Sequence, residues 1–248
     1  MSVLKLERLS PVVSERIKPF LREMLDGYPD NIHSIHIVGS SLTQDFNEKT
    51  SDINSVVVLK AMDLKFVEFV APLGKKYRKK GVAAPLIMTP EYIAGSLDVF
   101  PVEFLDLKLI HETVFGEDIL KDIEIKTSDL RQQCEREIKT KLIGLRQGYV
   151  SSMGDKHILT ERFVSSITGY MPLFRGIIHL MGKERPVGKY DVIKILSAAT
   201  GVNTAIFGKI FDMKKGIIKP GKDELVTVFE EYYSATEKIG KVIDELQV

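Results

Sequence analysis

Residues 35–59, IHIVGSSLTQDFNEKTSDINSVVVL, constrain the fold of this chain more than any other stretch. Two apolar runs rich in Ile and Val, IHIV and INSVVVL, lie at its ends, and both predict buried strands. The tripeptide Gly39-Ser40-Ser41 follows the first strand at once, where a short helix is expected to begin. This order places a polar Gly-Ser turn beside the start of the second strand.

Helices and strands alternate through the first half of the chain. Ser10 and Pro11 have the residue types of a helix N-cap and first helical position, and Asp63 and Thr89 have the same capping character. Helices are therefore expected over residues 11–28, after residue 63 and after residue 89. Strands are expected over residues 34–38, 52–59, 84–88 and 99–107.

The pattern changes near residue 127, after which every periodic run has helical spacing. The run from residue 156 to 182 is expected to form one helix, broken or kinked at Pro172. The predicted fold class is α+β. Residues 1–125 are predicted to form a mixed sheet flanked by helices, and residues 126–248 an all-α helical bundle.

Composition excludes several classes of protein. The formal net charge of +1 gives no overall attraction to nucleic acid or to an anionic membrane. No window approaches the roughly 20 apolar residues of a membrane-spanning helix, and no signal peptide is recognisable at the N-terminus. Cys134 is the one cysteine, which rules out a disulfide framework and fits a reducing cytoplasm. A cytoplasmic location without membrane partners is therefore expected.

The Gly39-Ser40-Ser41 turn is a candidate phosphate site. Backbone N–H groups and a hydroxyl at the start of a helix attract phosphate, and glycine lets the backbone approach closely. The alternative is an ordinary strand-to-helix turn without a ligand.

Asp52 and Asn54 lie two residues apart, so on a strand they face the same side. Two oxygen ligands at the mouth of a sheet suit a hard cation such as Mg²⁺, with Mn²⁺ as an alternative. A third carboxylate is expected from the strand predicted over residues 99–107, where Glu103 and Asp106 have opposite parity. Glu103 is favoured because it lies more centrally, and Asp106 stays the alternative.

Histidines are weaker candidates. His33 and His36 do not share parity on their strand, which argues against a metal pair between them. His111 lies near the end of the predicted fourth strand and is expected to be a structural histidine.

These residues resemble a family signature. The order of residues here is Gly39-Ser40, a spacer and then Ser51-Asp52-Ile53-Asn54. This order is similar to the motif of the DNA polymerase β-like nucleotidyltransferase superfamily. The helical half resembles the domain that follows the catalytic domain in aminoglycoside (kanamycin-type) nucleotidyltransferases. The resemblance implies a nucleoside triphosphate donor, Mg²⁺ and transfer of a nucleoside monophosphate to an unknown acceptor. It also implies a homodimer, because the kanamycin-type proteins build their site between two subunits.

By position in that motif, Gly39 and Ser40 would hold phosphate, Asp52 would bind a catalytic metal ion, and Glu103 would stand for the third carboxylate. Asn54 departs from the motif, which has a second carboxylate there. An amide oxygen can bind a cation but brings no charge, so weakened catalysis is expected. The alternative is a non-catalytic nucleotide-binding or regulatory module on the same fold.

Overall fold

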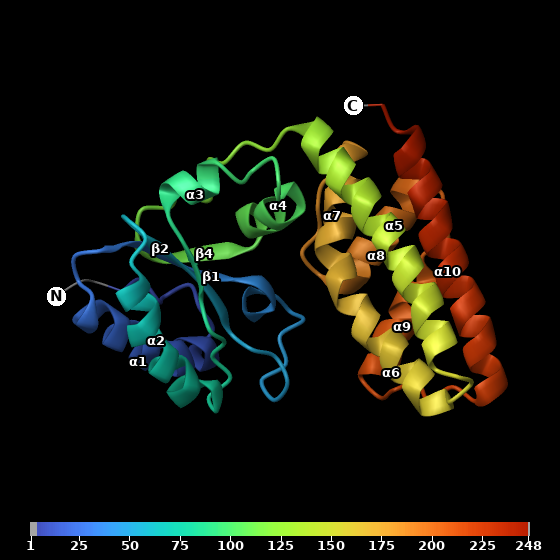
Figure 1. Ribbon diagram of the computed structural model, residues 1–248, viewed down its shortest axis with the longest axis horizontal. Helices are drawn as coiled ribbons and strands as arrows, with labels where there is room; N and C mark the ends of the chain where they lie inside the picture. The colour runs from blue at the N-terminus through green and yellow to red at the C-terminus, as the bar shows by residue number, and fades with distance from the viewer. Residues whose placement is uncertain (1–3, 248) are drawn as a thin grey trace. The chain divides into compact units, whose positions relative to one another are not determined.

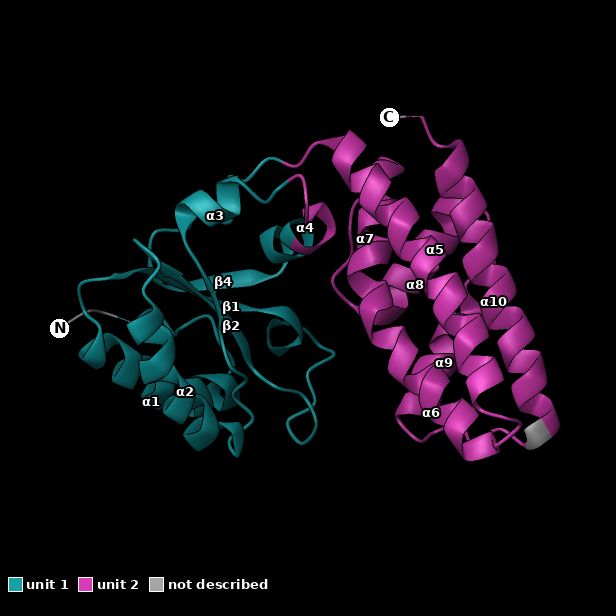
Figure 2. Cartoon of the chain, viewed as in Figure 1, with its two compact units in different colours: residues 1–97, 104–124 teal, residues 98–103, 125–248 magenta. Residues whose placement is uncertain are grey.

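The computed structural model describes residues 4–247, with the side chain of Lys222 left out (Figure 1). The chain forms two compact units (Figure 2). The first contains residues 1–97 and 104–124, and the second contains residues 98–103 and 125–248. Folding of residues 1–125 and 126–248 as independent domains stays a prediction.

The first unit is built on a four-stranded mixed sheet in the order β3-β2-β1-β4. The central strand β1 is antiparallel to β2 and to β4, whereas β2 is parallel to β3. The strands are β1 (Ile32–Val38), β2 (Asn54–Leu59), β3 (Leu86–Met88) and β4 (His111–Gly116). The predicted α+β class, a mixed sheet followed by helices, is confirmed.

Helices α1 (Pro11–Gly27) and α2 (Leu64–Arg78) pack with one face of this sheet (Figure 1). Both begin at the predicted caps: Ser10 accepts a hydrogen bond from Val13 N, and Asp63 accepts one from Lys65 N. Alternate strand residues such as Ile35 and Ile37 enter the same apolar core. Because side chains alternate along a strand, His36 and Val38 lie on the other face.

The strand predicted over residues 99–107 is wrong, because α4 (Pro101–Leu109) forms there. Pro101 occupies the first helical position, where its fixed φ is favourable and no N–H is needed. Short apolar runs do not distinguish a strand from a helix by pattern alone. The fourth strand is β4, and the short helix α3 (Pro90–Ala94) begins after Thr89 as expected.

In the second unit, residues 125–247 of the described chain form helices and no strand, as predicted. The predicted long helix over residues 156–182 is interrupted at η2 (Ile167–Gly169), and Pro172 lies in the first turn of the next helix. Proline is tolerated there because the first N–H groups of a helix have no intrahelical partner. The helices are α5 (Thr127–Ser151), α6 (Lys156–Ser166), α7 (Tyr170–Leu180), α8 (Lys189–Thr200), α9 (Ala205–Lys214) and α10 (Lys222–Glu245).

Helices α5 and α10 lie side by side along this unit (Figure 1). Its core is aromatic: the ring of Tyr170 lies 5.3 Å from that of Phe207 and 5.6 Å from that of Tyr232, measured between centroids. Across residues 4–247, no helix combines the length and the apolar character needed to cross a bilayer.

Candidate active site

One face of the sheet in the first unit carries Asn54 and His111. Val38 pairs with Asn54 of β2 on one side and with His111 of β4 on the other. Directly paired residues of antiparallel strands point to the same face. Asn54, Val38 and His111 therefore form one row, on the face opposite α1 and α2.

The Gly39 turn begins at the end of this row. Gly39 has φ +76°, in the left-handed region that glycine tolerates best. The element after it is a four-residue 3-10 helix, η1 (Gly39–Leu42), and not the longer helix expected. Such a short turn has little dipole, so any phosphate would be held by backbone N–H groups and the Ser40 hydroxyl. Ser41 is buried, and its hydroxyl donates to the Val38 carbonyl at 3.5 Å.

Asn54 is exposed and lies against this turn. A Cβ placed on Gly39 would lie 3.9 Å from Asn54 Nδ2. Asp52, also exposed, precedes β2, so a shared face with Asn54 stays a prediction. It is held in place through Ile53, whose N–H donates to the Gly81 carbonyl at 2.7 Å and whose carbonyl accepts from Ala83 N at 3.0 Å. The Gly39 turn and Asn54 at the start of β2 therefore lie next to each other.

Asp52 also lines a cavity of about 600 Å³. The cavity lies along α2 and the chain that leads into β3, and Lys75 and Arg78 contribute to its wall. Two cationic side chains near an exposed carboxylate make this cavity suited to an anionic ligand that also carries a metal ion.

A third carboxylate is not supplied by the edge strand that pairs with β2. That strand, β3, consists of Leu86, Ile87 and Met88. Glu103 lies instead in the first turn of α4, and its carboxylate accepts a hydrogen bond from Gln133 Nε2 at 2.8 Å. On a strand, Glu103 and Asp106 would point to opposite faces, and only one of them could share the site. On the helix α4, residues three positions apart share a face, so strand parity no longer separates the two. Either residue as the third carboxylate stays a prediction.

The histidines are closer together than the sequence suggested. His36 and His111 lie on adjacent strands with ring centroids 5.8 Å apart, and His111 Nε2 lies 2.9 Å from an oxygen of Asp118. Ligand atoms of these three residues all lie within 4.8 Å of one another. The HETVFG run, which contains the β-branched and aromatic residues Thr113, Val114 and Phe115, is the sequence signal for the strand that brings them together.

The electrostatics of this cluster follow from burial. Burial, followed by the neighbouring His111, lowers the pKa of His36 to about 4, so its ring is neutral at pH 7. Burial, the largest single effect, would raise the pKa of Asp118, but the hydrogen bond and the charge of His111, together with smaller effects of His36 and Thr113, lower the pKa overall. The cluster therefore pairs a neutral imidazole with an ionised carboxylate.

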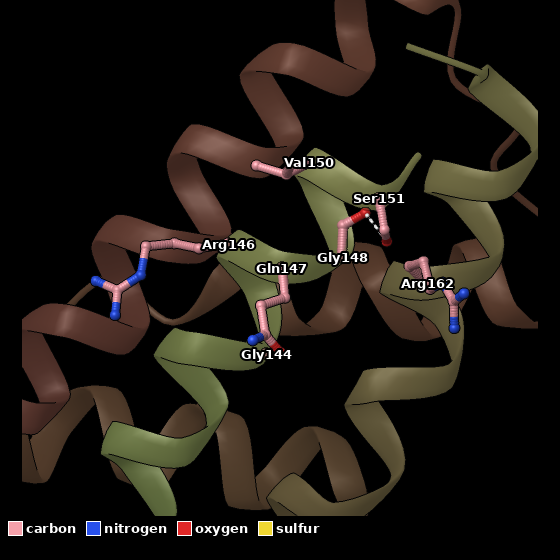
Figure 3. Close-up of a pocket in the computed structure, with 7 residues that line it drawn as sticks. All are labelled: Gly144, Arg146, Gln147, Gly148, Val150, Ser151 and Arg162. Atoms are coloured by element: carbon pink, nitrogen blue, oxygen red, sulfur yellow. Dashed lines mark hydrogen bonds between the residues drawn. The ribbon is translucent and has the colours of Figure 1, made fainter. Parts of the chain in front are cut away.

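A cavity of about 680 Å³ lies in the second unit, on α5 and α6 (Figure 3). It is lined by Gly144, Arg146, Gln147, Gly148, Val150, Ser151 and Arg162. This lining contains no carboxylate or imidazole, and the Arg146 guanidinium donates to the Tyr233 hydroxyl at 2.9 Å. Its two arginines could hold an anion, but the lining offers no anionic or imidazole ligand for a metal ion.

Comparisons with known proteins give limited information. No family model matches this chain, and no curated protein matches it. One similar solved structure is spectinomycin adenyltransferase AAD(9) from Enterococcus faecialis with ATP and spectinomycin. The similarity covers 94% of this chain and 98% of that chain, with a TM-score of 0.45 and 13% sequence identity. At this level it assigns no activity to the chain.

Proposed function

We propose that this chain is a nucleotidyltransferase-like protein whose first unit binds a nucleoside triphosphate together with Mg²⁺ or Mn²⁺. The observation that carries the proposal is the approach of Asn54 to the Gly39 turn. It brings a turn suited to phosphate against the strand that carries the metal-binding residues of the motif.

The residues of the site fit this assignment. Backbone N–H groups of the turn and the Ser40 hydroxyl would hold the phosphates. The Asp52 carboxylate and the Asn54 amide oxygen would hold the cation, and Mg²⁺ sites commonly use only one or two carboxylates plus substrate phosphates. The bound ion would neutralise phosphate charge. The protein would position the substrates, and a nucleoside monophosphate would pass from the triphosphate to an acceptor, with pyrophosphate as the leaving group.

Catalysis at this site is expected to be weakened. Asn54 replaces one carboxylate of the motif, and β3 brings none to the neighbouring strand. Removing one electrostatic group from an active site commonly lowers turnover by roughly 10² to 10³. The same two observations favour a second candidate function, a non-catalytic module that binds nucleotide and regulates a partner.

A nucleotide and metal screen separates the two functions. Thermal unfolding is followed with each of the four ribonucleoside triphosphates, with Mg²⁺, Mn²⁺ or EDTA, and pyrophosphate release is measured for every ligand that raises the melting temperature. Asp52→Ala is compared with Asp30→Ala, a control that removes an equally exposed acid from the same unit.

Nucleotidyl transfer predicts a metal-dependent rise in the melting temperature and a release of pyrophosphate. Asp52→Ala should abolish both effects, and Asp30→Ala should abolish neither. The binding module predicts the shift without release. No shift with any nucleotide and metal contradicts both functions. A homodimer and a cytoplasmic location form part of the proposal, and light scattering during gel filtration tests the dimer.

A further inference from the structure

The cluster of His36, His111 and Asp118 is a distinct site in the first unit. His36 is fully buried in β1, and the side chain of His111 is 9% exposed in β4. Asp118 follows β4 and has a side chain that is 33% exposed. A cluster with two buried members and one at the surface has both fixed ligands and a route of entry.

The hydrogen bonds of His111 require a positive charge beside Asp118. His111 Nδ1 lies 2.8 Å from the Leu107 carbonyl oxygen, which can only accept, so Nδ1 carries a proton. In a neutral ring, Nε2 would then direct its lone pair at the Asp118 carboxylate oxygen 2.9 Å away. That arrangement is repulsive unless a proton or a metal ion lies between the two atoms.

The Leu107 contact is also the usual support for a metal-bound histidine. Such a histidine donates its second ring N–H to a carbonyl or carboxylate, which fixes the tautomer and the orientation of the ring. His111 has this bond, and its free nitrogen points at a second candidate ligand. The geometry therefore fits a metal ion in place of the proton.

His36 is oriented toward the same point. Its Nδ1 lies 2.9 Å from the Thr113 hydroxyl, and that hydroxyl also bonds Asp118. Nδ1 is therefore the ring nitrogen on the side of the carboxylate. In the metal-free chain the Thr113 hydroxyl gives its one proton to Asp118, so it accepts a hydrogen bond from His36 Nδ1. His36 Nε2 lies 2.9 Å from the Ser34 hydroxyl, which can either donate to Nε2 or accept from it. A metal ion would take the place of the Nδ1 proton, and Nε2 would then carry the ring proton and donate to Ser34.

We propose that His36, His111 and Asp118 form a binding site for Zn²⁺, separate from the cation site of Asp52 and Asn54. Two imidazoles and one carboxylate are a common donor set for this ion, and they leave a fourth position for water or another ligand. Bonds of about 2 Å place the ligand atoms of a four-coordinate site about 3.3 Å apart. The pair of His111 and Asp118, at 2.9 Å, would therefore separate slightly, and the wider pairs, within 4.8 Å, would move together. Mg²⁺ prefers all-oxygen sites, so it does not compete here.

Metal titration of the whole chain tests this site without any nucleotide, so its outcome is independent of the proposed function. The protein is stripped with a chelator, and Zn²⁺ is titrated in competition with a chromophoric chelator. Co²⁺ is then added as a spectroscopic substitute for Zn²⁺. We expect one equivalent of Zn²⁺ per chain, the intense visible absorption of four-coordinate Co²⁺, and no displacement by excess Mg²⁺.

Two pairs of variants locate the bound ion. Asp118→Asn keeps the size of the side chain and is matched by Asp122→Asn, an exposed acid in the same segment. His111→Gln is matched by His157→Gln, an exposed histidine of α6. Substitution of a residue that only supports a metal ligand typically costs 10- to 100-fold in metal affinity. Substitution of a ligand itself, as in Asp118→Asn or His111→Gln, should therefore cost more than about 100-fold in Zn²⁺ affinity.

The two control variants should bind Zn²⁺ and Co²⁺ as the natural chain does. Circular dichroism checks that Asp118→Asn and His111→Gln are folded. Failure of the natural chain to bind Zn²⁺ overturns the proposal, as does unchanged Zn²⁺ affinity in a folded Asp118→Asn variant. Loss of binding in either control variant also overturns it.

Discussion

Gly39 lies next to the side chain of Asn54: a Cβ added to Gly39 would be in van der Waals contact with Asn54 Nδ2, at 3.9 Å. The two residues belong to adjacent ends of β1 and β2, because Val38 pairs with Asn54. Any ligand held by the turn therefore meets the side chain at position 54. In the proposed site, the charge of that side chain would set how strongly a cation is held beside the ligand.

Asn54→Asp should strengthen the site. The change restores the second carboxylate of the motif at an exposed position, so little cost in folding is expected. We expect tighter metal-dependent nucleotide binding and pyrophosphate release higher by roughly tenfold or more, since charge stabilisation of this kind is worth about 10²-fold elsewhere. Gln44→Glu makes the same amide-to-acid change at an exposed nearby position and should have no effect. Equal rates of pyrophosphate release in the natural chain, Asn54→Asp and Gln44→Glu would show that position 54 does not bind the cation.

Gly116→Ala and Gly39→Ala should differ sharply in stability. Both glycines have positive φ, +73° and +76°, so both variants carry a left-handed strain of about 1 kcal/mol. At Gly39 the new Cβ meets nothing closer than 3.9 Å, but at Gly116 it would lie 2.0 Å from the His33 carbonyl oxygen. Gly116→Ala must move backbone, which adds at least about 1–3 kcal/mol or prevents folding. Urea denaturation measures both, and equal losses would contradict the close approach of β1 to Gly116.

The pH dependence of unfolding should report the buried His36. Its folded pKa of about 4 lies below the ordinary value of 6.5, so the unfolded chain takes up a proton in this range before the folded chain does. Stability is therefore full above pH 6.5 and falls as the pH drops toward 4, by no more than about 3 kcal/mol. Denaturation in chelator-containing buffers from pH 7.5 to 4 measures the slope.

The same series on His36→Gln provides the control, because glutamine can bond Ser34 and Thr113 without titrating. The other charged groups near His36 are His111, Asp118 and His33. The pKa of Asp118 is lowered from 3.8, so its main effect on stability falls below this window. An unchanged slope in His36→Gln would assign the pH dependence to other groups.

Gln133→Leu should destabilise the second unit. Gln133 is 4% exposed, and its side chain accepts from Val102 N at 2.8 Å and donates to Glu103. Leucine leaves the buried Val102 N–H without a partner, at a cost of about 1–3 kcal/mol. Gln132→Leu changes the exposed neighbour and should stay within about 0.5 kcal/mol of the natural chain. Equal stability of the two variants would contradict the cap that Gln133 provides at the start of α4.

The sequence by itself determined the elements whose signals are local. β1 follows from alternating Ile residues and β2 from a continuous apolar run of Val and Leu, and α1, α2 and α3 follow from Ser10, Asp63 and Thr89 at their caps. These predictions held because capping and side-chain alternation depend on residues within a few positions of one another. The all-helical second half followed from its periodicity in the same way.

Only the tertiary structure decided the elements around residues 99–116. The apolar run there fits a helix or a strand, and the pairing of β4 with β1 selects HETVFG as the strand. This pairing removes the strand argument for Glu103 and brings His111 beside His36, which is 75 positions earlier in the chain. Contacts between residues so far apart depend on strand order and register, and local residue patterns carry no record of either.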